Sequence, residues 1–403
     1  MVPSGWNVKS FGGVVKLSKI KYDPKKAGKC FPCIELEHIA QETGQIIGST
    51  PASSLGSIKN KFNIGDVIFG KLRPYLRKYA TPSFEGVCSS EIWVFNPTNE
   101  ITNPYLFQFV QSDKFITEAN KSAGSKMPRA DWGVVSEMLM PIPPLPEQRK
   151  IAKILSTWDK AISTTERLID NSKQKKKALM QQLLTGKKRL LDDSDKPFVG
   201  EWEEFTVGTI AKLTAGGTPS TKHSEYWGGK IPWMNSGEVN LKQVFSVEGR
   251  ITDLGLNNSS TKEIPENSIL IALAGQGKTR GTIAINRIKL CTNQSIAAIM
   301  PDEARLSAEF LYFNLDNRYK ELRAMSTGDG GRGGLNLNIL KSIKLKLPLV
   351  KEQEMIATVL INADKEIELL EQQFADLKQE KKALMQQLLT GKCRVKVDEK
   401  EVA

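Results

Sequence analysis

The chain has 403 residues, of which 40% are hydrophobic, and a formal net charge of +12. This length is too great for one small core and suits two domains of ordinary size. No apolar run reaches membrane-spanning length, and the start, MVPSGWNVKS, lacks the apolar core of a signal peptide. Five cysteines, an odd number, argue against a disulfide framework, so we expect a cytoplasmic location. The basic excess favours an acidic polymer as partner, although a cytosolic protein can be basic without one.

Residues 1–145 combine short strand-like runs with one helical stretch. Residues 105–115 place apolar side chains on one face of a helix that starts at an Asn-Pro pair. A basic loop over 121–129 and a last strand-like run follow. Strands bounded by Gly, Pro, Asn or Ser are predicted over 13–17, 66–69 and 91–95. The pattern predicts a mixed α+β domain.

A long helix is predicted next, within the segment 146–190. Apolar residues recur there at alternating steps of three and four once Thr165, Ser172 and Lys176 are counted with them, which is the 3.5-residue period of a helix that packs along one narrow seam. Prolines precede the helix, and Gly186 follows it as the predicted C-cap. At about 1.5 Å per residue, roughly 38 residues give a helix of about 57 Å.

The second half of the chain repeats this plan. A second domain over 191–350 is followed by a second helix over 351–392 and a short tail, 393–403. Residues 176–187 and 381–392 are identical letter for letter, and matching positions in the two helices differ in number by 205 throughout. Such a repeat indicates a duplicated structural unit.

The two domains share only a skeleton of matching motifs. The run 65–69 (GDVIF) is matched by 266–270 (ENSIL), and 88–91 (CSSE) by 291–294 (CTNQ). The helices are therefore nearly identical while the domains differ. We infer that a common partner fixes the helices and that the domains are free to recognise two different targets.

Symmetry predicts how the helices pair. Two like units in a closed assembly are most simply related by a two-fold rotation, and a two-fold axis perpendicular to the helices makes them antiparallel. An ordinary helical hairpin or a dimerisation coil is the alternative that periodicity leaves open. Because packing alone rarely requires the same polar residues twice, we predict a repeated docking surface for another protein, formed by Gln181, Gln182 and Lys187 and by their copies Gln386, Gln387 and Lys392.

Catalytic and cofactor motifs are hard to find in this sequence. The tripeptide 277–279 (GKT) resembles a nucleotide-binding loop, but Ala272 stands where that motif needs glycine. The tripeptide 103–105 (NPY) resembles an amino-methyltransferase motif without its second proline, and a helix start explains it better. Cys30 and Cys33 lack the second ligand pair of a zinc site. We therefore expect no catalysis by this chain and no metal or cofactor bound to it.

Basic, aromatic and glycine-rich loops remain as candidates for function. Arginine and lysine pair with phosphates or guanine edges, and tyrosine with phosphates or base faces. Any one of these loops can be an ordinary solvated loop, but their presence in both halves of a basic chain favours DNA binding. The candidate DNA-binding residues are Lys71, Arg73, Tyr75, Arg77, Lys78, Lys126 and Arg129 in the first domain, and Thr218, Ser220, Lys222, Lys278, Thr279, Arg280, Arg287, Arg332 and Asn336 in the second.

The combination of motifs resembles the specificity subunit of a type I restriction-modification system, and the resemblance covers nearly the whole chain. The first domain departs from the family pattern, because it lacks the Gly-Gly-Thr-Pro-Ser run and has CSSE in place of the Cys-Asn-Gln pattern. The resemblance is carried by 143–148 (PPLPEQ), the duplicated ALMQQLLTGK helix ends, 216–220 (GGTPS), 226–229 (YWGG), 231–233 (IPW) and 291–294 (CTNQ).

This resemblance implies two target-recognition domains, each of which reads one half of a split, asymmetric DNA site. It also implies two modification (methyltransferase) subunits, which dock on the paired helices and bring S-adenosylmethionine, and restriction subunits, with ATP and Mg expected on these partners. The length of the paired helices, about 57 Å, equals between one and two turns of a DNA duplex at about 34 Å each. The helices would therefore fix the length of an unread spacer between the half-sites. A stand-alone DNA-binding regulator and a self-sufficient methyltransferase are the alternatives.

Overall fold

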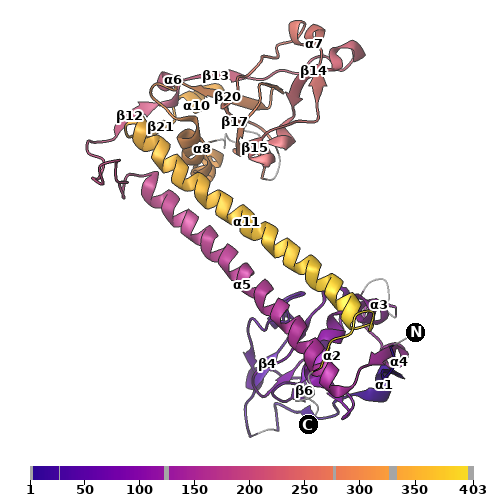
Figure 1. Ribbon diagram of the computed structural model, residues 1–403. Helices are drawn as coiled ribbons and strands as arrows, with labels where there is room; N and C mark the ends of the chain where they lie inside the picture. The colour runs from indigo at the N-terminus through magenta and orange to yellow at the C-terminus, as the bar shows by residue number, and fades with distance from the viewer. Residues whose placement is uncertain (1–2, 27, 122–126, 276–277, 326–333, 398–403) are drawn as a thin grey trace. The chain divides into compact units, whose positions relative to one another are not determined.

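The computed structural model describes residues 3–397, apart from 27, 122–126, 276–277 and 326–333. It contains two compact units: unit 1 joins Met1–Ile169 to Leu370–Ala403, and unit 2 is Asp170–Leu369. Helices α5 (Leu145–Leu183) and α11 (Val350–Leu388) have 39 residues each. Each helix is divided between the units, with one part in unit 1 and the other part in unit 2. The predicted class, two mixed α/β domains connected by two long helices, is confirmed (Figure 1). None of the helices in the described part of the chain has the length and apolarity needed to cross a membrane.

The described residues of the first domain form three sheets and four α-helices. A two-stranded antiparallel sheet pairs β1 (Asn7–Ser10) with β11 (Leu139–Ile142). The four-stranded sheet has the order β2 (Val15–Leu17), β10 (Ile92–Pro97), β7 (Val67–Gly70), β8 (Tyr79–Ala80). The five-stranded sheet has the order β3 (Lys21–Tyr22), β6 (Lys59–Phe62), β9 (Gly86–Cys88), β4 (Pro32–Ile34), β5 (Thr50–Pro51). The α-helices are α1 (Phe11–Val14), α2 (Asn103–Gln111), α3 (Asp113–Asn120) and α4 (Trp132–Glu137), and the 3-10 turns are η1 (Leu36–His38), η2 (Ala52–Ser54) and η3 (Pro74–Leu76).

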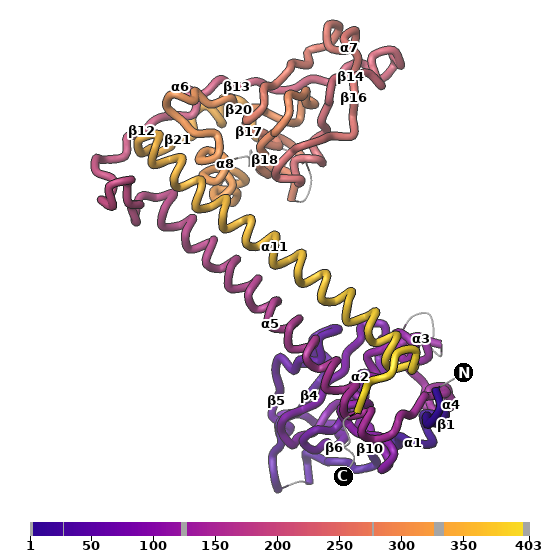
Figure 2. The backbone as a smooth tube through the Cα atoms, in the orientation of Figure 1, coloured from indigo at the N-terminus to yellow at the C-terminus, as the bar shows by residue number. Residues whose placement is uncertain are grey.

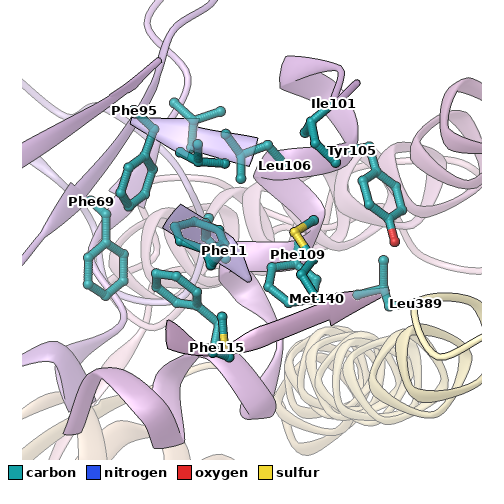
Figure 3. Close-up of a cluster of buried hydrophobic side chains, with 14 of the residues drawn as sticks. Phe11, Phe69, Phe95, Ile101, Tyr105, Leu106, Phe109, Phe115, Met140 and Leu389 are labelled. Atoms are coloured by element: carbon teal, nitrogen blue, oxygen red, sulfur yellow. The ribbon is translucent and has the colours of Figure 1, made fainter. Parts of the chain in front are cut away.

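Aromatic side chains fill the core of the first domain. The ring of Phe11 lies edge-on to Phe95, with centroids 5.6 Å apart, and 5.4 Å from the ring of Phe115. Leu389, which follows α11, reaches the same core near Tyr105 (Figure 3). Residues from the end of the chain therefore complete a core that begins at its start, and their burial removes apolar surface from water.

The second domain repeats this plan, with sheets of two, five and three strands among its described residues. Its central sheet has the order β13 (Ala211–Ala215), β20 (Ile296–Pro301), β17 (Ile269–Ala272), β18 (Ile283–Asn286), β15 (Gln243–Val244). The remaining strands are β12 (Glu203–Thr206) with β21 (Lys344–Leu347), and β16 (Arg250–Ile251), β14 (Trp227–Met234) and β19 (Cys291–Thr292). The helices are α6 (Val207–Ile210), α7 (Asp253–Asn257), α8 (Ala308–Asn317), α9 (Tyr319–Met325) and α10 (Leu337–Lys341), with 3-10 turns η4 (Ser224–Tyr226) and η5 (Ser236–Leu241).

Within each unit, segments of α5 and α11 run antiparallel, as predicted (Figure 2). In unit 1, Lys381 of α11 lies 2.5 Å from Asp159 of α5, and Arg394, beyond the end of α11, pairs with Glu147 near the start of α5. Residue numbers therefore rise along one helix as they fall along the other. The same two ion pairs recur in unit 2, between Lys176 and Asp364 and between Arg189 and Glu352.

The first domain differs from the sequence prediction at α1 and at the break between α2 and α3, and it contains α4, which was not predicted. The predicted strand over 13–17 is wrong in its first half, because residues 11–14 form α1, which buries Phe11 and Val14 on one face. The predicted helix over 105–115 is interrupted at Ser112, whose hydroxyl accepts a hydrogen bond from the backbone N–H of Phe115 (3.3 Å) and caps α3. A serine hydroxyl can accept a hydrogen bond from a backbone N–H in place of a helix carbonyl, which ends one helix and caps the start of the next.

Candidate nucleic-acid interface

The connection between β7 and β8 in the first domain carries most of the predicted basic residues. It contains the short turn η3, which is flanked by Arg73 (φ 52°) and Arg77 (φ 51°), both in the left-handed conformation. Few residues other than glycine adopt this conformation, because the Cβ atom crowds the backbone. Arg73 is exposed, and Tyr75 at the tip of the turn is 53% exposed. The hairpin therefore has a strained backbone at two positions, and it exposes one arginine and one tyrosine side chain to solvent.

The connection between β17 and β18 is the equivalent hairpin of the second domain. The cross-strand pair Phe69–Tyr79 of the first hairpin corresponds to Ile271–Ile283 of the second. Counted from the preceding strand, Arg73 then matches Gly275 (φ 131°); counted from the following strand, Arg77 matches Gly281 (φ 81°). Both left-handed positions recur, and the second domain occupies them with glycine.

In each domain a second loop joins this hairpin. In the first domain the N–H of Arg73 donates to the carbonyl of Pro128 (2.7 Å), and the N–H of Ala130 donates to the carbonyl of Lys71 (2.8 Å). In the second domain the N–H of Leu335 donates to the carbonyl of Leu273 (3.0 Å). Two regions predicted as separate contact loops therefore lie side by side in each domain. The predicted contacts Lys126 and Arg332 lie outside the described residues.

The predicted basic residues of the first hairpin fall into two groups. Arg73 is exposed and Arg129 is 54% exposed, although the latter also donates to Glu91 (3.0 Å). Lys71 is half-buried. In contrast, the ammonium of Lys78 donates to the carbonyl of Leu36 (2.5 Å), and the guanidinium of Arg77 bonds to Gln111 and Asp113. Arg73 and Arg129 therefore face solvent, whereas Lys78 and Arg77 hold the hairpin on its own domain.

The second domain separates its predicted basic residues further. Lys278 is exposed, Thr279 and Arg280 are half-buried, and the Tyr319 hydroxyl donates to the carbonyl of Lys278 (2.7 Å). Asn336 is exposed and its side chain accepts from the N–H of Ile339 (3.0 Å), which caps α10.

Arg287 does not belong to the same loop as Lys278. Residues 283–286 form strand β18 between these two predicted contacts and place Arg287 at its far end. There the guanidinium makes two bonds to Glu309 (2.6 and 2.9 Å) and further bonds to Gln243 and Asn267 (2.8 Å each). These bonds hold β18 against α8, which favours a structural role for Arg287.

The motif 216–220 (GGTPS) is packed against the motif 291–294 (CTNQ). The N–H of Gly217 donates to the carbonyl of Thr292 (2.8 Å), and the hydroxyl of Thr218 bonds to the side-chain oxygen of Gln294. A Cβ at Gly216 would lie 2.3 Å from the carbonyl oxygen of Thr292, so only glycine fits. The exposed candidates Thr218, Ser220 and Lys222 therefore follow a segment whose glycines serve close packing.

The structure corrects two matches between the domains. Because Phe69 pairs with Tyr79 as Ile271 pairs with Ile283, the predicted match of 65–69 with 266–270 is wrong by one residue. The match of 88–91 with 291–294 is also wrong. In the parallel pairs β4–β9 and β14–β19, Ile34 lies opposite Cys88 and Met234 lies opposite Thr292. The next residues, Ser89 and Asn293, donate to the carbonyls of Ile34 and Met234 at the same distance, 3.0 Å. Cys88 therefore corresponds to Thr292, and the predicted match with Cys291 is wrong by one residue.

The identical helix ends have one buried face and one exposed face. Packing explains the buried identities, which are Met180, Leu183 and Leu184 in unit 2 and Met385, Leu388 and Leu389 in unit 1. The predicted docking residues are all exposed: Gln181, Gln182, Lys187, Gln386, Gln387 and Lys392. Internal packing does not account for the identity of these exposed residues. The repeated polar face therefore stays a predicted docking surface.

Comparison with known proteins shows the family. The model of the type I restriction modification DNA specificity domain matches residues 3–172 and again residues 200–379. The chain is similar to the putative type I restriction enzyme MjaX specificity subunit of Methanocaldococcus jannaschii, with 24% identity over 98% of this chain and 95% of that protein. It is also similar to the EcoR124I/EcoR124II specificity subunit of Escherichia coli, with 32% identity over 41% of each chain.

Two solved structures share the fold. The HsdS subunit of Thermoanaerobacter tengcongensis has a TM-score of 0.51 and 21% identity, with 97% of this chain and 98% of that chain covered. The type I restriction-modification S subunit of M. genitalium has a TM-score of 0.61 and 15% identity, with 95% and 96% covered. The two matches to the family model fall on the two halves of the internal repeat and cover most of the sequence. The chain therefore belongs to the family of type I restriction-modification DNA specificity proteins.

Proposed function

We propose that this chain is the DNA sequence-recognition subunit of a type I restriction-modification complex and that each domain reads one half of a bipartite, asymmetric site. The observation that carries the proposal is the pair of equivalent hairpins, each joined by a second loop and each with different side chains at matching positions. The first hairpin presents Arg73 and Tyr75, and the second presents Lys278. Equivalent scaffolds with unlike side chains suit the reading of two different base sequences.

The partners follow from the repeated helix ends. Each unit exposes one copy of the same Gln-Gln…Lys surface, so two modification subunits would dock, one on each copy. These subunits would bring S-adenosylmethionine, and restriction subunits would bring ATP and Mg. In this arrangement methylation and cleavage take place on the partners, and this chain selects the site.

The first prediction concerns one contact in each domain. Arg73→Ala should relax the sequence preference at one half-site, and Lys278→Ala at the other, because each side chain is exposed on a different reading hairpin. A lost base contact costs about 1–3 kcal/mol of discrimination. Long-read methylome sequencing of cells that express each variant with its modification subunit would reveal the methylated sites.

Lys365→Ala is the matched control, because it removes the same charge from an exposed lysine that belongs to helix α11 and to neither hairpin. It should leave both half-sites unchanged. Equal relaxation of both half-sites by Arg73→Ala would contradict the assignment of one half-site to each domain. Tight, specific DNA binding by the isolated chain, with no methylation beside the modification subunit, would favour a stand-alone regulator instead.

A further inference from the structure

We propose that Arg77 is a positioning residue, which fixes the DNA-reading hairpin of the first domain to α3 and to the C-terminal part of α11, rather than a DNA contact. The role rests on the proposed function, because it presupposes that this hairpin reads DNA. It replaces the sequence prediction for Arg77 and assigns DNA contact in this hairpin to Arg73 and Tyr75.

The backbone gives the first argument. Arg77 has φ 51°, and the equivalent position of the second domain is Gly281, with φ 81°. The fold therefore requires a left-handed residue at this point, and glycine meets the requirement without strain. An arginine at a left-handed position persists only where its surroundings hold it there. The backbone conformation does not explain an arginine at this position, so the explanation must come from the contacts of its guanidinium group.

The contacts of Arg77 show what it contributes. One guanidinium nitrogen donates to the carbonyl of Gln111 at the end of α2 (3.1 Å), and another pairs with Asp113 at the start of α3. The carbonyl of Arg77 accepts from the N–H of Glu42 (3.0 Å), whose carboxylate lies 4.0 Å from the guanidinium. The side chain is only 25% exposed. Arg77 thus joins the hairpin to three other segments of its domain.

The same two carboxylates bind α11. The ammonium of Lys382 lies 3.1 Å from Asp113, and that of Lys378 lies 3.2 Å from Glu42. Each acid is therefore shared between Arg77 and a lysine of α11. Burial acts to raise the pKa of Asp113, but hydrogen bonds and charges from Arg77 and Lys382 outweigh it, so the pKa is lowered and the carboxylate stays charged.

This cluster lies beside the predicted docking surface. A groove of about 760 Å³ is lined by Arg77, Asp113 and Lys382 and also by Gln386, one of the exposed repeated residues. The hairpin is therefore tied to the helix at the place where a partner subunit would dock. In contrast, the facing acids make Arg77 a poor phosphate ligand, because a phosphate near Asp113 and Glu42 would meet like charge.

In the second domain a different contact holds the equivalent hairpin in place. Gly281 has no side chain, and the Tyr319 hydroxyl of α9 holds the hairpin through the carbonyl of Lys278 (2.7 Å). A change at Arg77 should therefore affect the half-site read by the first domain and leave the other half-site unchanged.

The test compares Arg77→Gly with Asp113→Asn in the full chain bound to its modification subunits. Methylation rates would be measured on duplexes with the native site and with single-base changes in either half-site, so that kcat and KM are separated. Both variants should raise KM for the native site and reduce discrimination at one half-site by about tenfold, the order expected for one well-placed base contact. The double variant should lose no more than either single variant, because both changes break one link.

Glu118→Gln is the matched control for Asp113→Asn, because this residue lies on the same helix α3 and, among the described residues, its ion pair is the local one with Lys121 (2.8 Å). It should leave discrimination and the unfolding midpoint unchanged. The glycine at position 77 can adopt the backbone of Gly281, so the variant should fold, and Asp113→Asn tests the link independently if it does not.

Other outcomes separate the two readings of Arg77. If Arg77→Gly weakens binding to every sequence equally, with a smaller salt dependence, while Asp113→Asn changes nothing, Arg77 is a phosphate contact and the positioning role is overturned. If the unaltered complex methylates no bipartite site, the proposed function itself fails, whatever the variants do.

Discussion

Single glycines mark the places where two segments of the second domain come closest. A Cβ at Gly217 would lie 2.4 Å from the backbone nitrogen of Thr261 and 2.6 Å from the carbonyl carbon of Ser260. Backbone atoms cannot move aside as a flexible side chain can. The GGTPS motif, which contains the DNA-binding candidates Thr218 and Ser220, therefore has a packing role in its first two residues.

We predict that Gly217→Ala destabilises the second domain by about 1–3 kcal/mol, because the added methyl group must displace backbone. Urea unfolding followed by a signal from the second domain would measure the change. Gly56→Ala is the control, since a Cβ there meets nothing within 4 Å. Similar stability of the two variants would show that the segment at Gly217 can shift without cost.

At the scale of elements, each long helix completes a domain remote in sequence. Leu388 of α11 is 3% exposed in the core of the first domain, and Leu183 of α5 is 1% exposed in the core of the second. Each domain therefore packs on the start of the helix that follows it and on the end of the other helix. The buried Glu147 and Glu352 reinforce these ends through Arg394 and Arg189.

Leu388→Ala should therefore destabilise the first domain by about 2–5 kcal/mol, the range for removing a buried leucine side chain. Hydrogen exchange should show the loss of protection in α2 and β11 of unit 1, which lie in the same core. Leu369→Ala, on the same helix but 71% exposed, should have little effect. Loss of protection confined to α11 would mean that the helix end does not support the domain.

At the scale of the whole molecule, α5 and α11 are continuous through the points where the two compact units divide, Ile169–Asp170 and Leu369–Leu370. Every ion pair between the helices described above lies within one unit. An insertion at these points would therefore leave the contacts of each domain intact and change only the length of helix between them. This separation allows the proposed role of the helices as a spacer to be tested alone.

We expect a seven-residue insertion at both points to lengthen the unread spacer by about three base pairs and to leave both half-sites unchanged. Seven residues add about 10.5 Å of helix and preserve the 3.5-residue seam, while one base pair rises about 3.4 Å. Methylome sequencing would measure the spacer. A flexible seven-residue insertion after Ser194, in the exposed connection that follows α5, is the control and should leave the spacer unchanged.

The sequence by itself determined the internal repeat, the long helices, their antiparallel pairing and the family. These features depend on periodicity, symmetry and motif spacing, all of which are written in local patterns. It also located the two hairpins, because runs of basic, aromatic and glycine residues are local. It missed α4 and placed a strand where α1 forms, because a helix of a single turn leaves almost no periodicity to detect.

Only the tertiary structure decided which basic residues face solvent and which hold the domain together. Arg77 bonds to Asp113, 36 residues away, and Arg287 bonds to Glu309, 22 residues away. It also decided that the last helical turns of the chain belong to the core of the first domain. The physical reason is the same in each case: an ion pair or a buried contact between distant segments depends on where the fold brings them, and no local pattern encodes that meeting.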